Sequence, residues 1–321
     1  MTDTEPGPRH LPVMVDRVLS WLEPVAQRPD AIVVDATVGL GGHSAALLAQ
    51  HPALRLIGID RDPAALERAA ARLAAHRDRL TLVHAVYDAL PRVLESSGVT
   101  RVDGVLFDLG VSSMQLDQDE RGFSYARDTG LDMRMDPSSS LTAADVVNGY
   151  SVDALTKVLR DFGEERFARR IARAIERERA IAPLTSSARL ADLVRDAVPA
   201  ATRRTGGHPA KRTFQALRIE VNDELGALRR ALPAAIAALR VGGRLVVLAY
   251  QSLEDRIVKR ALLNAASETA PPDLPVVPAD ASPQLRLLTR GAERPADREV
   301  ADNPRAAAAR LRAAERIREA A

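Results

Sequence analysis

Ala31-Ile-Val-Val-Asp35-Ala-Thr-Val-Gly39-Leu-Gly41-Gly42-His43-Ser44 is a short apolar run that ends in an acid and then breaks into glycines, and it decides the fold. The apolar run is typical of a buried strand, and residues 45–50 that follow are good helix formers without a breaker. The glycines therefore lie where a parallel strand turns into the N-terminus of a helix. Such a turn offers a ligand bare backbone N–H groups and the positive end of a helix dipole.

A second strand is predicted by the run Leu54-Arg-Leu-Ile-Gly-Ile59, which ends at Asp60. This acid follows the glycine loop by about twenty residues, where Rossmann-type sheets carry the carboxylate that binds ribose hydroxyls. The two strands together predict a site for a nucleoside.

The kind of nucleoside is indicated by the loop and by Asp35. Gly39-x-Gly41-x-x-Ser44 nearly matches the dinucleotide fingerprint but lacks its third small residue, and no Gly-Lys-Ser/Thr follows to make a phosphate-cradling P-loop. A carboxylate at Asp35 would repel a pyrophosphate but can accept a hydrogen bond from an ammonium, which favours S-adenosylmethionine. Taken alone, the loop also fits a tight turn that binds nothing.

Composition limits the class of protein. With 321 residues, 46% of them hydrophobic, the chain can bury a full core, and we expect one large domain with an insertion. No apolar run approaches the roughly eighteen residues of a membrane span, and residues 1–8 lack a signal-peptide pattern, so we expect no membrane association and a cytoplasmic location. The chain has no cysteine and its six histidines are scattered, so no metal site is expected.

The net charge of +2 does not by itself indicate a nucleic-acid partner, which must be argued from where the charges lie. Nearly all basic residues are arginines, which suit bidentate phosphate contact. The same bias, together with the high alanine content, also fits a GC-rich genome, and we favour that interpretation.

Strands and helices alternate through the first third of the chain. Residues 1–9 are expected to be disordered, and an amphipathic helix follows around residues 15–22. Further helices are predicted at residues 63–76 and 90–95, and further strands at Leu80–His84 and Val102–Asp108. This pattern predicts a parallel sheet with helices on both faces, in which ligands bind at the carboxyl ends of the strands. Four polar side chains converge on that edge: Asp35, Asp60, Tyr87 and Asp108.

The alternation then stops, and the following residues predict helices. Thr142-Ala-Ala-Asp145 outlines a capping box, and helical periods run over residues 164–182 and 186–198. The arginines of residues 164–182 are interspersed with glutamates, which favours a solvated, salt-bridged helix. This region is a helical insertion between the fourth and fifth strands.

The chain returns to the main domain through a basic segment. Arg203, Arg204, Lys211 and Arg212 occur with no acid between them in a stretch that contains Gly and Pro, which predicts a loop that binds RNA phosphate. A helix is then predicted over residues 215–239, ended by Gly242-Gly243, and strands at residues 244–250 and 284–289. The tail from residue 303 is helical by propensity, and an antiparallel closing strand at the sheet edge also fits it.

Eight motifs resemble one family in order along the chain. They are Thr37-Val-Gly-Leu-Gly-Gly-His-Ser44, Ile59-Asp-Arg-Asp-Pro63, Asp108-Leu-Gly-Val-Ser-Ser-Met-Gln-Leu-Asp117, Glu120-Arg-Gly-Phe-Ser124, Leu131-Asp-Met-Arg-Met-Asp136, Gly163-Glu-Glu-Arg-Phe-Ala168, Arg212-Thr-Phe-Gln-Ala-Leu-Arg218 and Ser252-Leu-Glu-Asp-Arg-Ile-Val-Lys259. The chain resembles the bacterial 16S rRNA cytosine-N4 methyltransferases, the RsmH or MraW family, nearly end to end. Two positions depart from the family pattern: Met114 replaces a proline, and Gln251 replaces a histidine.

The resemblance implies an α/β fold, with a Rossmann-like class I S-adenosylmethionine-dependent methyltransferase sheet and an all-helical insertion domain. It implies a methyltransferase domain of residues 1–116 and 214–321 and an RNA-recognition insertion of residues 117–213. The implied activity is N4-methylation of a cytidine in the decoding centre, the P-site region, of 16S rRNA, with an assembled or nearly assembled 30S particle as partner. Both a monomer and a homodimer remain open.

The family's cofactor contacts carry over by position to Gly41, Gly42, His43, Asp60, Tyr87, Asp108 and Gln115. Our reasoning from the residues adds Asp35 to the cofactor site. We further hypothesise that Asp108 is catalytic, because its carboxylate can accept from the cytosine amine and orient it toward the sulfonium methyl.

Two rival functions from other classes remain at this stage. An NAD-dependent oxidoreductase would bind a dinucleotide at the same glycine loop. A non-catalytic rRNA-binding assembly factor could keep the fold without the chemistry. The intact glycine loop, Asp60 and Asp108 argue against the second rival.

Overall fold

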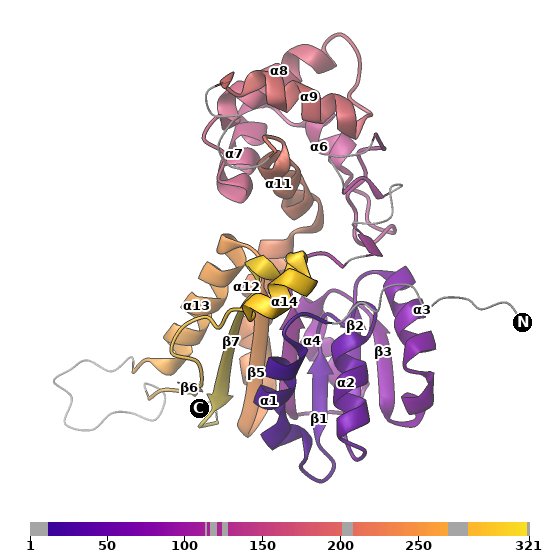
Figure 1. The fold of residues 1–321 in the computed structure, drawn as a ribbon, viewed down its shortest axis with the longest axis vertical. Helices are drawn as coiled ribbons and strands as arrows, with labels where there is room; N and C mark the ends of the chain where they lie inside the picture. Colours follow the sequence, from indigo (N-terminus) through magenta and orange to yellow (C-terminus); the bar gives the residue numbers. More distant parts are fainter. Residues whose placement is uncertain are drawn as a thin grey trace, which may run out of the picture. The chain divides into compact units, whose positions relative to one another are not determined.

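The computed structural model describes residues 12–112, 114–115, 121–123, 128–200, 208–268 and 282–319. Residues 1–9, which the composition predicts to be disordered, lie outside these ranges, as do Arg203 and Arg204. The chain divides into two compact units (Figure 1). Unit 1 comprises Met1–Gly110 and Ala227–Ala321, and unit 2 comprises Val111–Gly226.

Unit 1 is built on one sheet, which in the described residues has seven strands in the order β3-β2-β1-β4-β5-β7-β6. The strands are β1 (Ile32–Asp35), β2 (Arg55–Asp60), β3 (Leu80–His84), β4 (Val102–Asp108), β5 (Leu239–Ala249), β6 (Leu285–Leu287) and β7 (Arg310–Arg316). The first five strands are parallel, whereas β7 runs antiparallel to both β5 and β6. The predicted Rossmann-like α/β sheet is thus confirmed.

Helices cover both faces of this sheet (Figure 1). They are α1 (Val15–Ala26), α2 (Gly42–Gln50), α3 (Pro63–Arg72), α4 (Leu90–Ser96), α12 (Glu224–Ala238), α13 (Ser252–Ala266) and α14 (Asp297–Asp302). Successive strand residues point to opposite faces, so Val33 joins a core with α1 and α2 while Val34 joins a second core with α4 and α12. In the described part of the chain, no helix is long and apolar enough to span a membrane.

The strand register brings the predicted acids to one edge. Asp35 is paired with Gly58 of β2 and with Leu106 of β4, and Asp108 is paired with Leu248 of β5. The chain crosses the sheet between β1 and β4, because β2 and β3 continue outward on one side and β5 on the other. Ligands of such sheets bind at this switch point, beyond the carboxyl ends of the strands.

Unit 2 is helical, as predicted. Its helices are α6 (Ala143–Gly149), α7 (Val152–Gly163), α8 (Ala168–Arg179), α9 (Ser187–Ala197) and α11 (Lys211–Asn222). Thr142 and Asp145 form the expected capping box at the start of α6, and Ser151 caps α7. These helices share one buried apolar core.

Three predicted boundaries differ from the structure. Lys211 and Arg212 are the first two residues of α11 rather than part of a loop. The helix predicted over residues 215–239 is two helices, because Asp223 adopts a left-handed conformation (φ 46°) that ends α11. Gly242, with φ 75°, does not precede β5 but lies within it, where the pairing with β4 shifts register.

The limits of unit 2 also differ from the predicted insertion of residues 117–213. The helix α11 belongs to unit 2 because it packs closely on α7: a Cβ on Gly163 would lie 2.6 Å from the carbonyl oxygen of Arg212. For the segment from residue 303, the sequence left both a helix and an antiparallel closing strand open. The structure has the closing strand, since β7 pairs with β5. It is not the edge strand, because β6 lies outside it.

Candidate active site

The loop after β1 is held together by Asp35. This side chain is only 1% exposed, and its Oδ2 accepts a 2.6 Å hydrogen bond from the Ser44 hydroxyl in α2. Its Oδ1 accepts from the Thr37 backbone N–H at 3.3 Å. Asp35 therefore ties the end of β1 to the first turn of α2, with the glycines between them.

The three glycines of the loop have different surroundings. Gly39 and Gly41 both have positive φ, of 52° and 74°, which a side chain would strain. A Cβ on Gly41 would approach the Leu73 side chain at 3.1 Å, and one on Gly42 would lie 2.6 Å from the Pro12 ring. Only Gly39 has open space, since its nearest neighbour there is 3.8 Å away. Because Gly41 and Gly42 have no side chain, neighbouring residues can pack closely against the loop. Gly39, in contrast, leaves open space beside the loop.

Asp60 joins the same loop from β2. Its Oδ2 accepts from the Gly39 N–H at 2.8 Å, and its Oδ1 accepts from the Asp62 N–H at 2.9 Å. Burial raises the pKa of Asp60 more than these two hydrogen bonds lower it. The carboxylate keeps further lone pairs for a ligand's hydroxyl groups.

Asp108 lies at the end of β4, with 26% of its side chain exposed. Its Oδ1 accepts a 2.7 Å hydrogen bond from the Tyr250 hydroxyl, directly after β5. Its backbone N–H donates to the Thr37 hydroxyl at 2.6 Å. Burial raises the pKa of Asp108, and burial beside this acid also raises the pKa of Tyr250 well above its usual value.

His43 provides the second partner of Asp108. Its Nε2 lies 3.0 Å from the Val13 carbonyl oxygen, which can only accept, so the network assigns a proton to Nε2. Its Nδ1 lies 3.5 Å from Asp108 Oδ2. His43 thus places its imidazole ring beside the second carboxylate oxygen of Asp108.

The site collects buried negative charge. Burial is the main reason that the pKa of Asp35 rises to about 6, and the neighbouring Asp108 carboxylate raises it further, while the Ser44 hydrogen bond and the His43 charge lower it. Three carboxyl groups with raised pKa values at one edge favour a cationic ligand. S-adenosylmethionine fits this environment, because it carries both a sulfonium and an ammonium.

Two further predicted residues lie in different units. Tyr87 lies in unit 1, in the 3-10 turn Tyr87–Ala89 beyond β3, where its ring meets Phe107 edge-on with centroids 5.6 Å apart. Gln115 lies in unit 2, where its side chain is buried and its Oε1 accepts from the Ser112 N–H at 3.1 Å. Packing thus fixes the Tyr87 ring, and a local turn fixes Gln115.

Of the predicted RNA-binding residues, Lys211 and Arg212 are exposed at the start of α11. Arg212 donates from Nη1 to the Glu164 carbonyl oxygen at 3.4 Å. Arg203 and Arg204 lie outside the described residues.

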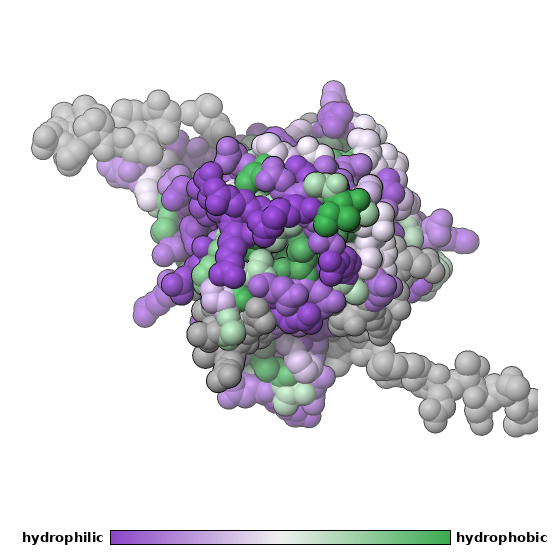
Figure 2. All heavy atoms as spheres, turned by 90° about the horizontal axis from the view of Figure 1, so that it is seen from above, coloured by the Kyte–Doolittle hydropathy of each residue, from purple (hydrophilic) through white to green (hydrophobic). Residues whose placement is uncertain are grey.

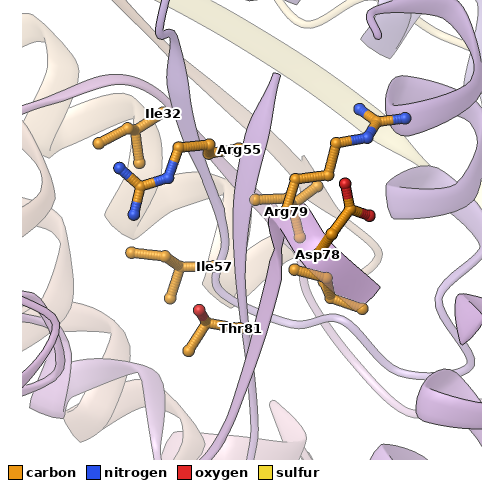
Figure 3. Close-up of a pocket in the computed structure, with 8 residues that line it drawn as sticks. Ile32, Arg55, Ile57, Asp78, Arg79 and Thr81 are labelled. Carbon is orange, nitrogen blue, oxygen red and sulfur yellow. The ribbon is translucent and has the colours of Figure 1, made fainter. Parts of the chain in front are cut away.

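A small cavity of about 60 Å³ lies away from this site (Figure 3). It is lined by the amino-terminal ends of β2 and β3, including Arg55, Leu80 and Thr81, and by Asp78 and Arg79. It has room for a couple of waters, whereas ligand pockets hold several hundred Å³. Arg79 donates to three carbonyl oxygens around the end of α2, so its role is structural.

Sequence reasoning missed three residues of the site: Thr37, Ser44 as a partner of Asp35, and Tyr250. Tyr250 had an available signal, since it directly follows β5 and the rule that singled out Asp35 and Asp108 applies to it equally. No pattern in the sequence indicates the pairing of Thr37 with Asp108, which arises only when β1 and β4 become neighbours.

Known proteins resemble the chain over its full length. The MraW methylase family model matches residues 8–317. A protein from Parafrankia sp. (strain EAN1pec) named ribosomal RNA small subunit methyltransferase H is 65% identical, with 96% of this chain and 94% of that protein covered. A protein of the same name from Thermobifida fusca (strain YX) is 62% identical, with 98% and 95% covered. The solved structure of an rRNA methylase from Streptococcus thermophilus has 12% identity and a TM-score of 0.43, with 94% and 95% covered.

These matches identify the activity as methyl transfer with S-adenosylmethionine as the cofactor, which confirms both predictions and removes the NAD-dependent and non-catalytic alternatives. The class I methyltransferase fold predicted for the sheet is likewise confirmed. The carboxylate-lined edge of the sheet and the sequence match over residues 8–317 lead to one conclusion: the chain belongs to the MraW methylase family.

Proposed function

We propose that this enzyme methylates N4 of a cytidine in the decoding centre of 16S rRNA, within an assembled or nearly assembled 30S particle in the cytoplasm. The names of the relatives, ribosomal RNA small subunit methyltransferase H, support the rRNA substrate. The family resemblance of the motifs supports the cytidine N4. The observation that carries the chemistry is Asp108, a partly exposed carboxylate at the switch point with Tyr250 and His43 on its two oxygens.

The cofactor would be held by the loop after β1 and the end of β2. Asp60 is suited to accept from the ribose hydroxyls, and Tyr87 to contact the adenine with its ring. Gly41, Gly42 and His43 give the loop its shape beside Gly39, and Asp35 supplies negative charge for the ammonium. Gln115 is proposed as a further contact on the basis of the resemblance alone.

The bound cofactor supplies a methyl group on a sulfonium, which needs no activation. The residues of the chain must therefore orient the cytosine amine and take its proton. A carboxylate oxygen of Asp108 can accept from the amine N–H and direct the nitrogen at the methyl carbon. As the methyl group moves to the nitrogen, S-adenosylhomocysteine would leave and the amine would lose a proton. The Asp108 carboxylate, with the His43 ring beside its Oδ2, is the group placed to accept that proton.

Tyr250 would keep Asp108 in place for this step. Its hydroxyl donates to Oδ1, which fixes the carboxylate plane and leaves Oδ2 as the atom closer to His43. Orientation of this kind lowers the free-energy barrier to methyl transfer, because the reacting atoms must be nearly in line.

The test uses 30S particles from a strain that lacks this protein. The purified chain is incubated with them and S-adenosylmethionine, and the rRNA is digested to nucleosides for mass spectrometry. We expect one new N4-methylated cytidine, mapped to the decoding centre by fragment analysis. Methylation of another base, of carbon 5, or of a distant cytidine would refute the proposal. Naked 16S rRNA in parallel shows whether the particle is required.

A further inference from the structure

The outer face of α8 carries a stripe of arginines: Arg169, Arg170, Arg173 and Arg177, all exposed. With 3.6 residues per turn they fall within about 100° of one side of the helix. Ile171, Ala172 and Ile175 occupy the opposite side and are buried in the core of unit 2. We call these four arginines the α8 arginine face. Figure 2, which views the chain from above, shows hydrophilic side chains gathered around a small apolar area.

This face carries only part of the salt bridging that the sequence suggested. Arg169 lies 3.7 Å from Asp153, and both side chains are mostly exposed. Arg170, Arg173 and Arg177 form no ion pair with any described residue. The arginines of neighbouring α9 are different: Arg189 pairs with Glu178, and Arg195 pairs with Asp192 at 2.7 Å.

Helix stability does not account for the α8 arginine face. Arg169 and Arg173 are four residues apart, as are Arg173 and Arg177, and like charges at this spacing destabilise a helix. Arg169 and Arg170 also lie in the first turn, where the helix dipole disfavours cations, and no acid occupies that turn. Of the four arginines, only Arg177 lies in the last turn, where the helix dipole favours a cation. Helix stability therefore leaves most of this arginine face unexplained, and an anionic ligand would account for it.

The face continues toward the residues predicted to bind RNA. Arg212 donates a hydrogen bond to the carbonyl oxygen of Glu164. Glu164 lies in the turn before α8, three residues before the N-cap residue of that helix. The same segment packs on α11 at Gly163. Arg212 therefore lies near the turn between α7 and α8, in the same unit as the α8 arginine face.

We infer that the α8 arginine face binds the sugar-phosphate backbone of the rRNA outside the target nucleotide. This inference rests on the proposed function and deepens it. From Arg169 to Arg177 the helix rises about 12 Å, which matches about three or four phosphates of one strand. Arginine suits this role because its planar fork binds phosphate oxygens in pairs. RNA recognition by unit 2 then rests on a helix as well as on the predicted basic segment.

The test compares two variants of the full chain. In the first, Arg170→Gln, Arg173→Gln and Arg177→Gln are combined; in the matched control, Arg189→Gln and Arg195→Gln remove exposed but paired arginines of α9. Dissociation constants for 16S rRNA and for 30S particles are measured across a salt series. We expect the first variant to lower the salt slope by up to about 0.7 to 0.9 per lost phosphate contact. The control should keep the slope of the unmodified chain.

Two further readouts separate the inference from the function. In single-turnover methylation the first variant should need more 30S for half-maximal rate while reaching the same maximal rate, with unchanged affinity for S-adenosylhomocysteine. An unchanged salt slope in a chain that methylates 30S normally overturns the inference and leaves the function standing. Loss of 30S binding with unchanged binding of naked rRNA overturns it too, because the partner would then be a protein. If the unmodified chain methylates no rRNA, the proposed function fails, and the salt slopes on rRNA still decide the inference.

Discussion

Asp108 has contacts from three parts of the chain: its carboxylate meets Tyr250 after β5 and His43 in α2, and its backbone N–H donates to Thr37 after β1. Its position was predictable, because an acid at the end of a buried run is visible in the sequence. Its partners were not, because each comes from a different strand or helix and is brought near only by the sheet order. At the scale of single residues, the sequence therefore identifies the acids and leaves their hydrogen bonds open.

Replacing Asp108 by Ala should slow methyl transfer by more than its loss of cofactor binding explains. A lost hydrogen bond to a charged acceptor is worth about 1.5 to 3 kcal/mol, or roughly ten- to more than a hundredfold in rate. The measurement is single-turnover methylation of 30S across a cofactor titration. Asp60→Ala is the control, since excess S-adenosylmethionine should largely rescue it. Recovery of the Asp108 variant at high cofactor would make Asp108 a binding residue only.

Tyr250→Phe tests the orientation of Asp108 without removing the carboxylate. We expect a maximal rate about tenfold lower, because one hydrogen bond to a charged group is lost and the ring remains. Binding of S-adenosylhomocysteine, followed by calorimetry, should hardly change. Tyr150→Phe is a matched control, since the Tyr150 hydroxyl also donates to a carboxylate, Glu220, at 2.8 Å but lies in unit 2. Equal rates for the two variants would contradict the role of Tyr250.

Asp35 should make the ligand-free protein less stable as the pH rises. Its pKa is about 6 in the folded chain against 3.8 ordinarily, so the folded state binds the proton more tightly than the unfolded state. Asp35 contributes its full stabilisation of up to about 3 kcal/mol below pH 3.8, and this contribution is lost as the pH rises through about 6. We would measure urea unfolding of the chain and of Asp35→Asn between about pH 4 and pH 7. The stability of the original chain relative to the variant should fall over this range; a constant difference would contradict the shift.

At the scale of elements, the strands were predicted best. The runs Leu80–His84 and Val102–Asp108 match β3 and β4. For β4 the reason is that buried strands of a parallel sheet are continuous apolar runs, whereas β3 is an edge strand with no buried residue. The break at Asp223 was missed, since neither Gly nor Pro marks it. The tail was ambiguous because its alanine-rich sequence favours a helix while pairing with β5 makes it a strand. Such a choice is made by tertiary contacts, which no local pattern contains.

One buried side chain caps the end of α12. Arg316 of β7 is fully buried and donates to the carbonyl oxygens of Ile236, Ala237 and Leu239, around the end of this helix. Arg316→Met should destabilise the chain by about 1 to 3 kcal/mol for each buried carbonyl left without a donor. Arg286→Met, which removes an exposed ion pair to Glu315, should cost less than about 1 kcal/mol. Urea unfolding of both variants measures the difference, and equal losses would refute this capping role.

At the scale of the whole molecule, the net charge of +2 hides local groups of like charge. Unit 1 gathers carboxylates at the carboxyl edge of its sheet, whereas unit 2 carries unpaired arginines on α8. These two local groups match the roles that we propose, with a cationic cofactor bound by unit 1 and an anionic polymer bound by unit 2. Total charge could not reveal this, because acidic and basic residues nearly balance within each unit: unit 1 has 27 basic and 25 acidic residues, and unit 2 has 18 of each.

The place of β7 has a consequence for how the chain is made. The strand pairs along β5, yet the ribosome adds it only after α13, β6 and α14. Until then β5 has an unpaired row of backbone N–H and C=O groups, and the Asp255 carboxylate lacks its ion pairs with Arg310 and Arg312. A nascent chain therefore has an unpaired strand edge beside the proposed active site for as long as translation of that stretch takes. Slow codons or a stalled ribosome there should favour aggregation, and a chaperone that shields strand edges would act in this interval.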